Sequence, residues 1–506
     1  MYRNFWKKKS NIIHWFTKPK KILSLKRDKY VFYDDGKTNI AYNCVKKNID
    51  EGRGNNDAIV FISEKNERKI LTFFELEYLI NHFISYLFKN FKKNELKKNN
   101  IAIHSSANLC SAISMLACMK LGITHCVIFN ELSKEAIEIR CKLIKCKILI
   151  SSASTKDFKK KIVPIKKKLK LKVLRFTDDS EKKFTINNEK FLNKKNIPLN
   201  IGYSHVKANK KSFILFTSGS TGEPKGIAHS TGGYLVYTKF SCINKFNISN
   251  QSTILTASDA GWINGHTYAL YGPLSIGAKT ILLEKPMSLL DSEILRSVLI
   301  DFKVNILYLP VTLIRLMKAL DKQIKIKSKH LSLLGSMGEP LSKFVGYWFS
   351  KKFSTTQLQI VNTYFQTETA GIVSSPSFND SIKKVSIGTV GKPISKYLEM
   401  FIEKTNSEIK IKKPWPGCFI QVINNKKLMD VYWDKDRNFR LFDLASYDKN
   451  KNIIIHGRLD DVINIRGHRI GSGEIESVLL KLKDIKEICV ISVDDNLSGK
   501  KIIIFL

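Results

Sequence analysis

Residues 213–226 read FILFTSGSTGEPKG, an apolar run that leads into a loop of glycine, serine and threonine followed by a lysine. The apolar run predicts a buried strand. Glycines in such a loop let backbone N–H groups approach phosphate oxygens closely, hydroxyl groups add hydrogen bonds, and the ammonium group of Lys225 balances charge. The Walker A pattern does not fit this stretch, and a solvated turn is the alternative. The stretch therefore predicts a phosphate-binding loop after a strand.

On both sides of this loop, short β-rich runs alternate with helical patterns, which predicts an α/β fold of parallel layers. We expect strands at residues 58–63, 101–105, 124–129, 147–151, 213–217, 253–257 and 305–309, and helices at 73–91 and 107–120. Residues 154–209 are rich in lysine and weakly patterned, which predicts an exposed elaboration. Short strands and turns after residue 388 predict a smaller β subdomain.

Composition sets the class of protein. A chain of 506 residues that is 43% hydrophobic can bury a large core in more than one domain. No apolar run approaches the roughly 18 residues of a membrane-spanning helix, so no membrane partner is expected. The N-terminus lacks the apolar stretch of a secretory signal. The nine cysteines contain no C-x-x-C pair, which argues against disulfides and structural zinc and favours a reduced, cytoplasmic setting.

The formal charge of +40 would suggest a nucleic-acid partner if the basic residues were clustered. The lysines instead spread along the whole chain, and asparagine and isoleucine are abundant too, as an AT-rich genome favours. We therefore expect no nucleic-acid partner. The basic first 30 residues contain Phe5, Trp6, Trp15 and Phe16, which predicts a packed N-terminal arm; a transit peptide is the alternative.

The loop resembles the signature motif of the adenylate-forming enzymes, which include acyl-CoA synthetases, luciferases and the adenylation domains of peptide synthetases. Five further stretches are similar to acetyl-CoA synthetases: NIAYNC at 39–44, HSTGGYL at 229–235, DAGWINGH at 259–266, YGPL at 271–274 and LGSMGEP at 334–340. They cover nearly the whole chain in order. The resemblance implies a large N-terminal adenylation domain (1–456), layered α/β with a small β subdomain, and an incomplete α+β lid (457–506).

This resemblance also implies a reaction. The carboxylate of a small acid attacks the α-phosphate of ATP, giving an acyl-adenylate and pyrophosphate. The lid then rotates about a hinge that matches Asp460, and the thiol of CoA attacks the adenylate. The implied cofactors are ATP, Mg²⁺ and CoA, and catalysis rests on positioning and electrostatic stabilisation. Acetate is the expected acid, with propionate as the alternative.

Residues for the phosphates and the metal follow from the same resemblance. Residues 364–369, YFQTET, resemble the second core motif of the family, in which Glu368 would bind Mg²⁺ and Thr367 would contact phosphate. Magnesium prefers carboxylate and phosphate oxygens, although a lone glutamate is otherwise a surface residue. The positions implied to contact the nucleotide are Thr217, Ser218, Gly219, Ser220, Thr221, Gly222, Gly338, Glu339, Pro340, Thr363, Tyr364 and Gln366.

Asp443 matches the family's ribose-binding aspartate, and Arg458 follows it at the family spacing. Arg469 matches an arginine that orients the phosphates, and Gly467 lies in the region that would line the pantetheine tunnel. Arginine suits these tasks because its planar fork binds oxygens bidentately, and a structural ion pair is the alternative. The family has glycine before this aspartate, so Phe442 is a departure, as is Leu444 after it.

The acyl pocket is implied by Ile263, Asn264, Met337 and Phe365. Acetyl-CoA synthetases have tryptophan at the position of Phe365, while Met337 and Ile263 are larger than the usual valines, so we expect a short acid. One methylene is worth only about 1–3 kcal/mol in such pockets, which leaves acetate and propionate unresolved. Core packing is the alternative reading of these residues, and Asn264 speaks against it.

The family continues beyond the length seen here and places a lysine near its end, against the substrate carboxylate. Lys500 and Lys501 do not match that position, so we expect slowed adenylation, by roughly 10²–10³. The lid could be completed by a separate polypeptide, or the chain could be a nucleotide-binding remnant without activity. We expect a helix at 473–482, a strand at 487–493, and uncovered apolar surface at 488–493 and 502–506.

Overall fold

The computed structural model describes the chain except residues 27–28, 177–200, 218–223, 322–323, 325, 354–356, 381–384, 424, 426, 460–461, 466–467, 472–474, 477–478, 480–481, 483–484, 486–487 and 496–498. Within the described part, no helix is both long enough and apolar enough to cross a membrane.

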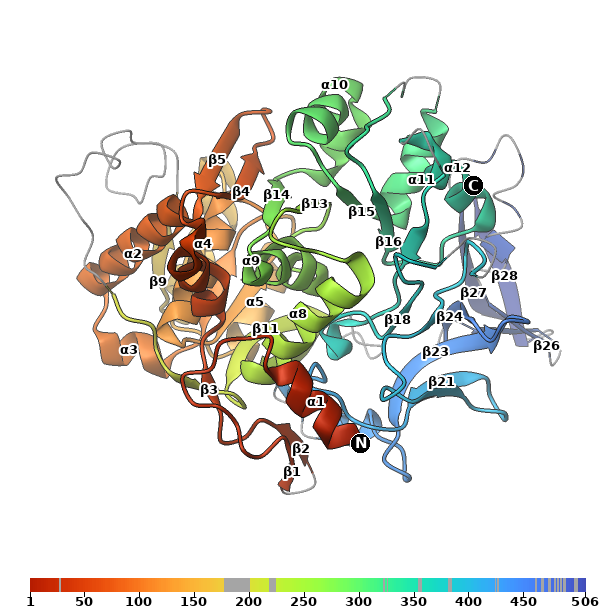
Figure 1. The fold of residues 1–506 in the computed structure, drawn as a ribbon, viewed down its shortest axis with the longest axis horizontal. Coiled ribbons are helices and arrows are strands. Elements are labelled where there is room, and N and C mark those ends of the chain that lie inside the picture. Colours follow the sequence, from red (N-terminus) through yellow and green to blue (C-terminus); the bar gives the residue numbers. More distant parts are fainter. Residues whose placement is uncertain are drawn as a thin grey trace.

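Two seven-stranded sheets form the body of the molecule (Figure 1). In the first, five strands run parallel; beyond β11, β12 runs antiparallel to β11, and β22 runs antiparallel to β12. Its spatial order is β22 (Gln421–Ile423), β12 (Lys225–Ser230), β11 (Lys211–Thr217), β7 (His125–Ile128), β6 (Ile101–His104), β8 (Ile148–Ser151) and β9 (Lys172–Arg175).

The second sheet is parallel except for β5 at one edge. Its spatial order is β17 (Ile360–Asn362), β16 (Leu333–Met337), β15 (Ile306–Pro310), β13 (Thr253–Thr256), β14 (Lys279–Leu283), β4 (Asp57–Ile62) and β5 (Arg68–Thr72). All the strands predicted from the alternating pattern are present, with ends within two residues of those expected. The predicted α/β fold is confirmed.

Helices fill the space between the sheets and cover their outer faces. One apolar cluster joins both sheets to α2 (Phe73–Asn90), α4 (Leu109–Leu121), α8 (Gly232–Phe246) and α9 (Gly272–Ile276). A second joins the first sheet to α5 (Lys134–Leu143) and α7 (Val163–Leu169). A third joins the second sheet to α10 (Ser292–Arg296), α11 (Val311–Ala319) and α12 (Lys343–Lys352). The short helix α3 (Lys93–Lys98) follows α2.

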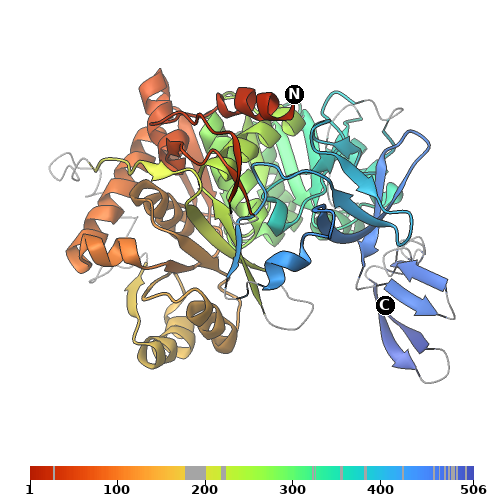
Figure 2. The same ribbon diagram turned by 90° about the horizontal axis from the view of Figure 1, so that it is seen from below.

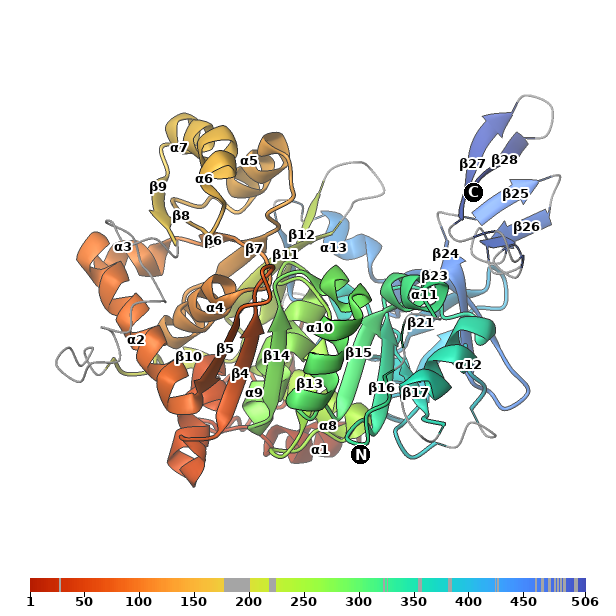
Figure 3. The ribbon, with the colours of Figure 1, turned by 90° about the horizontal axis from the view of Figure 1, so that it is seen from above.

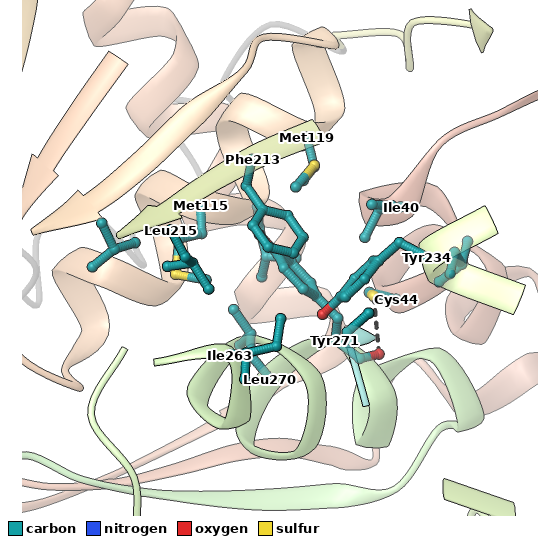
Figure 4. Packing of buried hydrophobic residues seen from close by; sticks show 14 of the residues in the cluster. Ile40, Cys44, Met115, Met119, Phe213, Leu215, Tyr234, Ile263, Leu270 and Tyr271 are labelled. Carbon is teal, nitrogen blue, oxygen red and sulfur yellow. Dashed lines mark hydrogen bonds between the residues drawn. The ribbon is translucent and has the colours of Figure 1, made fainter. Parts of the chain in front are cut away.

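The interior of the first cluster is aromatic and closely packed (Figure 4). The ring of Phe213, on β11, meets Tyr234 edge-on with centroids 4.7 Å apart, and Tyr271 and Ile263 lie near it. The thiol of Cys44 donates to the carbonyl of Tyr271 over 3.4 Å. The strand that carries the Gly/Ser/Thr-rich loop is therefore anchored in the centre of the core.

The N-terminal arm packs as expected. Helix α1 (Tyr2–Ser10) carries Phe5, whose ring centroid lies 4.7 Å from that of Tyr397 and 5.9 Å from that of Phe240. Trp6, on the same helix, is fully buried. The hydroxyl of Tyr2 donates to the carbonyl of Pro414. The arm continues through the hairpin β1 (Leu23–Lys26) and β2 (Lys29–Phe32) to β3 (Lys37–Thr38), which pairs with β10 (Val206–Lys207).

The expectation of an exposed elaboration over 154–209 is wrong for its first part. Residues 155–175 form α6 (Thr155–Asp157), a π-helical turn, α7 and the edge strand β9. Ile162 and Ile165 are buried against the first sheet, while Lys166, Lys167 and Lys168, which follow directly, are exposed. Residues 177–200 lie outside the described part of the chain.

A four-stranded antiparallel sheet forms the predicted β subdomain: β20 (Met400–Ile402), β21 (Glu408–Ile411), β23 (Phe439–Tyr447) and β24 (Ile453–Arg458). The paired strands β18 (Ser374–Ser375) and β19 (Lys392–Pro393) precede this sheet in the sequence. The helix α13 (Lys427–Val431) lies between β22 and β23. This subdomain lies beside the carboxyl end of the second sheet (Figure 1).

Two hairpins follow and stand away from the body (Figures 2 and 3): β25 (Val462–Ile465) with β26 (His468–Gly471), and β27 (Cys489–Asp495) with β28 (Gly499–Phe505). The strand expected at 487–493 is present as β27, and the helix expected at 473–482 falls mostly outside the described residues. Ile491, Val493, Ile504 and Phe505 are exposed, so the apolar surface expected there is observed.

Candidate functional site

The candidate site lies where parallel strands of the second sheet end. Met337 closes β16, and Thr363 and Tyr364 follow β17, so their positions meet at one edge of the sheet. Crevices at the carboxyl ends of parallel strands are the usual ligand sites of α/β folds. Gly338, directly after β16, has φ +90°, which only glycine adopts without strain, and a Cβ there would meet no atom within 4 Å.

Asp443, on β23, is the centre of a bonded cluster. Its Oδ2 atom accepts a hydrogen bond from the Tyr364 hydroxyl at 2.6 Å and one from Nε2 of Gln366 at 2.7 Å. Its Oδ1 atom lies 3.5 Å from Nη1 of Arg458, the residue paired with it across the β23–β24 ladder. The four residues that the sequence motifs assign to the nucleotide are thus brought together by side-chain contacts.

The burial of Asp443 has an electrostatic consequence. The residue is 6% exposed, and this desolvation raises the pKa of its carboxyl group to about 6, against the lowering effect of the Tyr364 hydroxyl and of Arg458. Above that pH the carboxylate is ionised and carries strong acceptor capacity in a poorly solvated position. Such a group is suited to accepting hydroxyl hydrogen bonds from a ligand.

The residue before Asp443 explains the departure from the family pattern. Phe442 has φ +56°, in the left-handed region where glycine is normally required. Its ring meets Tyr432 edge-on at 5.6 Å and lies 4.5 Å from the Arg440 guanidinium group. Phe442 therefore has a backbone conformation that glycine favours, and its ring adds side-chain contacts.

Glu368 lies in a single 3-10 turn, Thr367–Thr369, and is 8% exposed. Its Oε1 atom accepts a hydrogen bond from the Tyr432 hydroxyl at 2.7 Å, and its backbone carbonyl accepts one from the N–H of Phe419 at 3.0 Å. Among the residues that the structure describes, Glu368 makes no ion pair, and no donor bonds its other oxygen. One carboxylate oxygen is therefore held and the other is available.

A histidine connects this turn to the strand that follows the Gly/Ser/Thr-rich loop. Nε2 of His229, on β12, lies 2.8 Å from the carbonyl oxygen of Thr367, so this nitrogen donates. Burial lowers the pKa of His229 to about 4, and the ring is neutral at physiological pH. At the other end of β12, Lys225 is half-buried and pairs with Thr217 across the β11–β12 ladder. Ser218, Gly219, Ser220, Thr221 and Gly222 lie outside the described residues.

The four acyl-pocket positions are mostly buried. Nδ2 of Asn264 contacts the sulfur of Met337, and Phe365 packs against the cluster that contains Met337. Oδ1 of Asn264 is buried and has no partner among the described residues, which fits a polar atom that faces a ligand. Ile263 packs instead with the first cluster, to which Phe365 also contributes.

Two positions assigned to the nucleotide are engaged elsewhere in this structure. The hydroxyl of Thr363 donates to the Ser336 carbonyl at 2.7 Å and lies 2.7 Å from the Tyr308 hydroxyl, which ties β15, β16 and the end of β17 together. The carboxylate of Glu339 accepts from Thr312 at 2.6 Å and pairs with Arg315 at 2.7 Å. Pro340 follows it. Arg469 lies on β26, where the backbone alone is described, and Gly467 lies outside the described residues.

The motifs did not indicate Tyr432. It lies between α13 and β23, and no residue pattern around it suggests a contact with Glu368, which is 64 positions away in sequence. His229 belongs to a recognised stretch, but its bond to Thr367 spans 138 positions. Both contacts depend on the tertiary fold.

Comparison with known proteins identifies the family. A model of the AMP-binding enzyme family matches residues 48–417. The chain belongs to this family. A second model, of the acetyl-coenzyme A synthetase N-terminus, matches residues 2–44 of this chain. The resemblance to adenylate-forming enzymes is therefore confirmed.

Two curated relatives extend this result. This chain is 30% identical over 538 residues to acetyl-coenzyme A synthetase of Helicobacter acinonychis, and the match covers 100% of this chain and 80% of the relative. It is also 30% identical to acetyl-coenzyme A synthetase of Leptospira biflexa, with 98% and 80% covered. Among solved structures, anthranilate CoA ligase AuaEII in complex with anthranoyl-AMP matches with a TM-score of 0.76 and 17% identity over 92% of this chain and 86% of that one. The last match shows a shared fold.

Proposed function

We propose that this AMP-binding enzyme is an ATP-dependent acyl-CoA synthetase that activates a short carboxylic acid, acetate in the first place, through an acyl-adenylate. The observation that carries the proposal is the bonded set Tyr364, Gln366, Asp443 and Arg458, with Glu368 two positions along the chain from Gln366. It combines a buried hydroxyl acceptor with a carboxylate that has a free oxygen, which suits a magnesium nucleotide. The division into an adenylation domain (1–456) and a lid (457–506) is part of this proposal.

The residues of the candidate site would each contact a different part of ATP. Asp443 would accept the two ribose hydroxyl groups, and Arg458 would support it. Tyr364 and residues 338–340 would line the adenine. The ammonium group of Lys225 and the residues of the 217–222 loop would hold the phosphates, with Arg469 brought in from the lid. These groups supply orientation and charge in a partly desolvated crevice, where electrostatic contacts are strongest.

Magnesium fits the donors present. Among the described residues, no three histidine, cysteine, aspartate or glutamate side chains gather into a cage. Magnesium at nucleotide sites usually takes one or two carboxylates plus phosphate oxygens and water, and Glu368 offers one available carboxylate oxygen. Bound there, the ion would neutralise charge on the phosphates during attack. Thr367, fixed through its carbonyl by His229, would contact the same phosphates.

The acid would bind among Ile263, Asn264, Met337 and Phe365. Three of these are 4% exposed, and Met337 and Phe365 are bulky side chains, which favours acetate or propionate over longer acids. The unpartnered oxygen of Asn264 gives this apolar wall one polar position. In the second half-reaction CoA would enter past the lid, where Gly467 would line the tunnel.

The test is acyl-dependent exchange of pyrophosphate into ATP with Mg²⁺ and acetate, propionate, butyrate or benzoate. We expect exchange with the two shortest acids, and a loss of roughly 10²–10³ in Glu368→Gln, because one preorganised charged contact is removed. Glu64→Gln, which alters an exposed ion pair with Lys285, is the control. ATP binding without exchange would replace this proposal with a nucleotide-binding role, and preference for benzoate would overturn the assigned substrate class.

A further inference from the structure

A rigid turn precedes β23. The carboxylate of Asp434 accepts hydrogen bonds from the backbone N–H groups of Asp436 at 3.0 Å and Asn438 at 2.9 Å, and from the side-chain amide of Asn438 at 3.1 Å. Lys410 adds an ion pair at 3.1 Å. The N–H of Arg440 donates to the carbonyl of Tyr432 over 2.9 Å, which closes the hairpin. The Tyr432 carbonyl is therefore held across a turn that is itself bonded internally.

The ring of Tyr432 lies in an aromatic slot. It stacks on Phe439 at 5.9 Å with an interplanar angle of 18°, and it meets Phe419 and Phe442 edge-on at 5.0 and 5.6 Å. Tyr432 is 5% exposed. Because neighbours enclose the ring and the Tyr432 carbonyl is held, the hydroxyl group has one defined position.

The Tyr432 hydroxyl group contacts the candidate metal ligand, Glu368. The Tyr432 hydroxyl donates to Oε1 of Glu368 at 2.7 Å, and Phe419, from the same slot, donates its N–H to the Glu368 carbonyl. Two residues of the aromatic slot therefore hold Glu368, Tyr432 through its side chain and Phe419 through its backbone. Metal-binding carboxylates are commonly held by such outer hydrogen bonds, which fix the direction of the oxygen that faces the ion.

We propose that Tyr432 is a positioning residue for the divalent cation: its hydroxyl fixes the Glu368 carboxylate so that Oε2 is presented to the metal. This inference rests on the proposed role of Glu368 as the magnesium ligand. It adds a residue outside every recognised motif to the site. It also gives Phe442 a function, because its ring forms one wall of the slot that holds Tyr432.

The test compares Tyr432→Phe, which keeps the ring, with Tyr347→Phe on the exposed face of α12 as the matched control. The first readout is the Mg²⁺ concentration that gives half of the ATP-dependent rise in unfolding temperature. The second is Mn²⁺ binding to the ATP-loaded protein, followed by electron paramagnetic resonance. We expect Tyr432→Phe to need roughly 10–100 times more metal in both, while its affinity for AMP without metal stays within about twofold of the unaltered chain.

A double variant separates positioning from packing. If Tyr432 acts through Glu368, adding Tyr432→Phe to Glu368→Gln causes no further loss of metal affinity. An unchanged metal requirement in Tyr432→Phe overturns the inference. So does a parallel loss of metal binding, metal-free AMP binding and unfolding temperature, which is the result of a general packing defect. None of these readouts needs turnover, so a chain that fails pyrophosphate exchange but shows the shift loses the proposed function and keeps this inference.

Discussion

Asp443 and Glu368 are two buried carboxylates, and each accepts a hydrogen bond from one tyrosine hydroxyl, at 2.6 Å from Tyr364 and at 2.7 Å from Tyr432. Their other contacts differ. Asp443 also accepts a hydrogen bond from the side-chain amide of Gln366 and lies beside the Arg458 guanidinium group, so both of its oxygens have partners. Glu368 has one oxygen held and, within the described part of the chain, no cation beside it.

These different contacts favour a different ligand for each carboxylate. A carboxylate near an arginine and a donor amide already has part of its charge compensated, which suits neutral hydroxyl groups such as those of ribose. A carboxylate without a cation gains most from one, which suits a metal ion. Under the proposed function, the same tyrosine contact would orient a hydroxyl acceptor in one place and a metal ligand in the other.

The largest expected effect concerns the charge on Asp443. Burial raises its pKa from 3.8 to about 6, so the folded chain keeps this proton at pH values where the unfolded chain has lost it. The resulting stabilisation is complete below pH 4 and is lost as the pH rises to 6, a change of about 3 kcal/mol. Asparagine cannot ionise. The stability of Asp443→Asn relative to the unaltered chain should therefore rise by about that amount between pH 4 and pH 7.

Unfolding temperatures measured across this pH range at one scan rate test the prediction. Asp430→Asn, at an exposed position on α13, is the control and should follow the unaltered chain throughout. Parallel curves for Asp443→Asn would show that the carboxyl group is not desolvated in solution, and the contrast with Glu368 would lose its electrostatic part.

The next effect separates the two tyrosines. Tyr364→Phe removes a hydrogen bond to a charged group, which is worth about 1.5–3 kcal/mol, and should weaken metal-free AMP binding roughly tenfold or more. The Mg²⁺ requirement should stay unchanged, the opposite of the result expected for Tyr432→Phe. Titration calorimetry with AMP, followed by a Mg²⁺ titration at fixed ATP, provides both values. A shifted metal requirement in Tyr364→Phe would mean that the two carboxylates act as one unit.

The smallest effect concerns Phe442, which links the two carboxylates. Phe442→Gly relieves the left-handed backbone, whereas Phe442→Ala removes the same ring and keeps most of the strain. We expect the glycine variant to be the more stable of the two by about 1 kcal/mol in chemical denaturation. An alanine variant of equal or greater stability would indicate that the left-handed conformation at this position is not retained in solution.

The sheet strands could be predicted because their apolar runs are short, bounded and regularly spaced. The same approach failed for residues 155–175. There the buried Ile162 and Ile165 are flanked by exposed lysines, so a helix with one buried face looks like a solvated segment in the sequence. The glycine-like backbone of Phe442 could not be read from the residue itself, because phenylalanine rarely adopts it.

The candidate site was predictable where one motif contains its chemistry, as with Glu368 or Asp443. It was not predictable where a contact joins distant segments. Tyr432 and His229 contact the Thr367–Thr369 turn across 64 and 138 positions, and neither bond leaves a local pattern. The partners of Asp443 were known as separate motif residues, but only the fold shows that Tyr364 and Gln366 share one of its oxygens.

The N-terminal arm has a consequence for how this chain is made. Tyr2 bonds to Pro414, 412 positions later, and Phe5 packs against Tyr397. During synthesis the arm leaves the ribosome long before Tyr397 and Pro414, so this part of its docking surface forms late. The arm can therefore finish docking only late in translation, and Tyr2 and Phe5 stay partly uncovered until then. Expression temperature and chaperone supply should matter more for the yield of this protein than its final stability suggests.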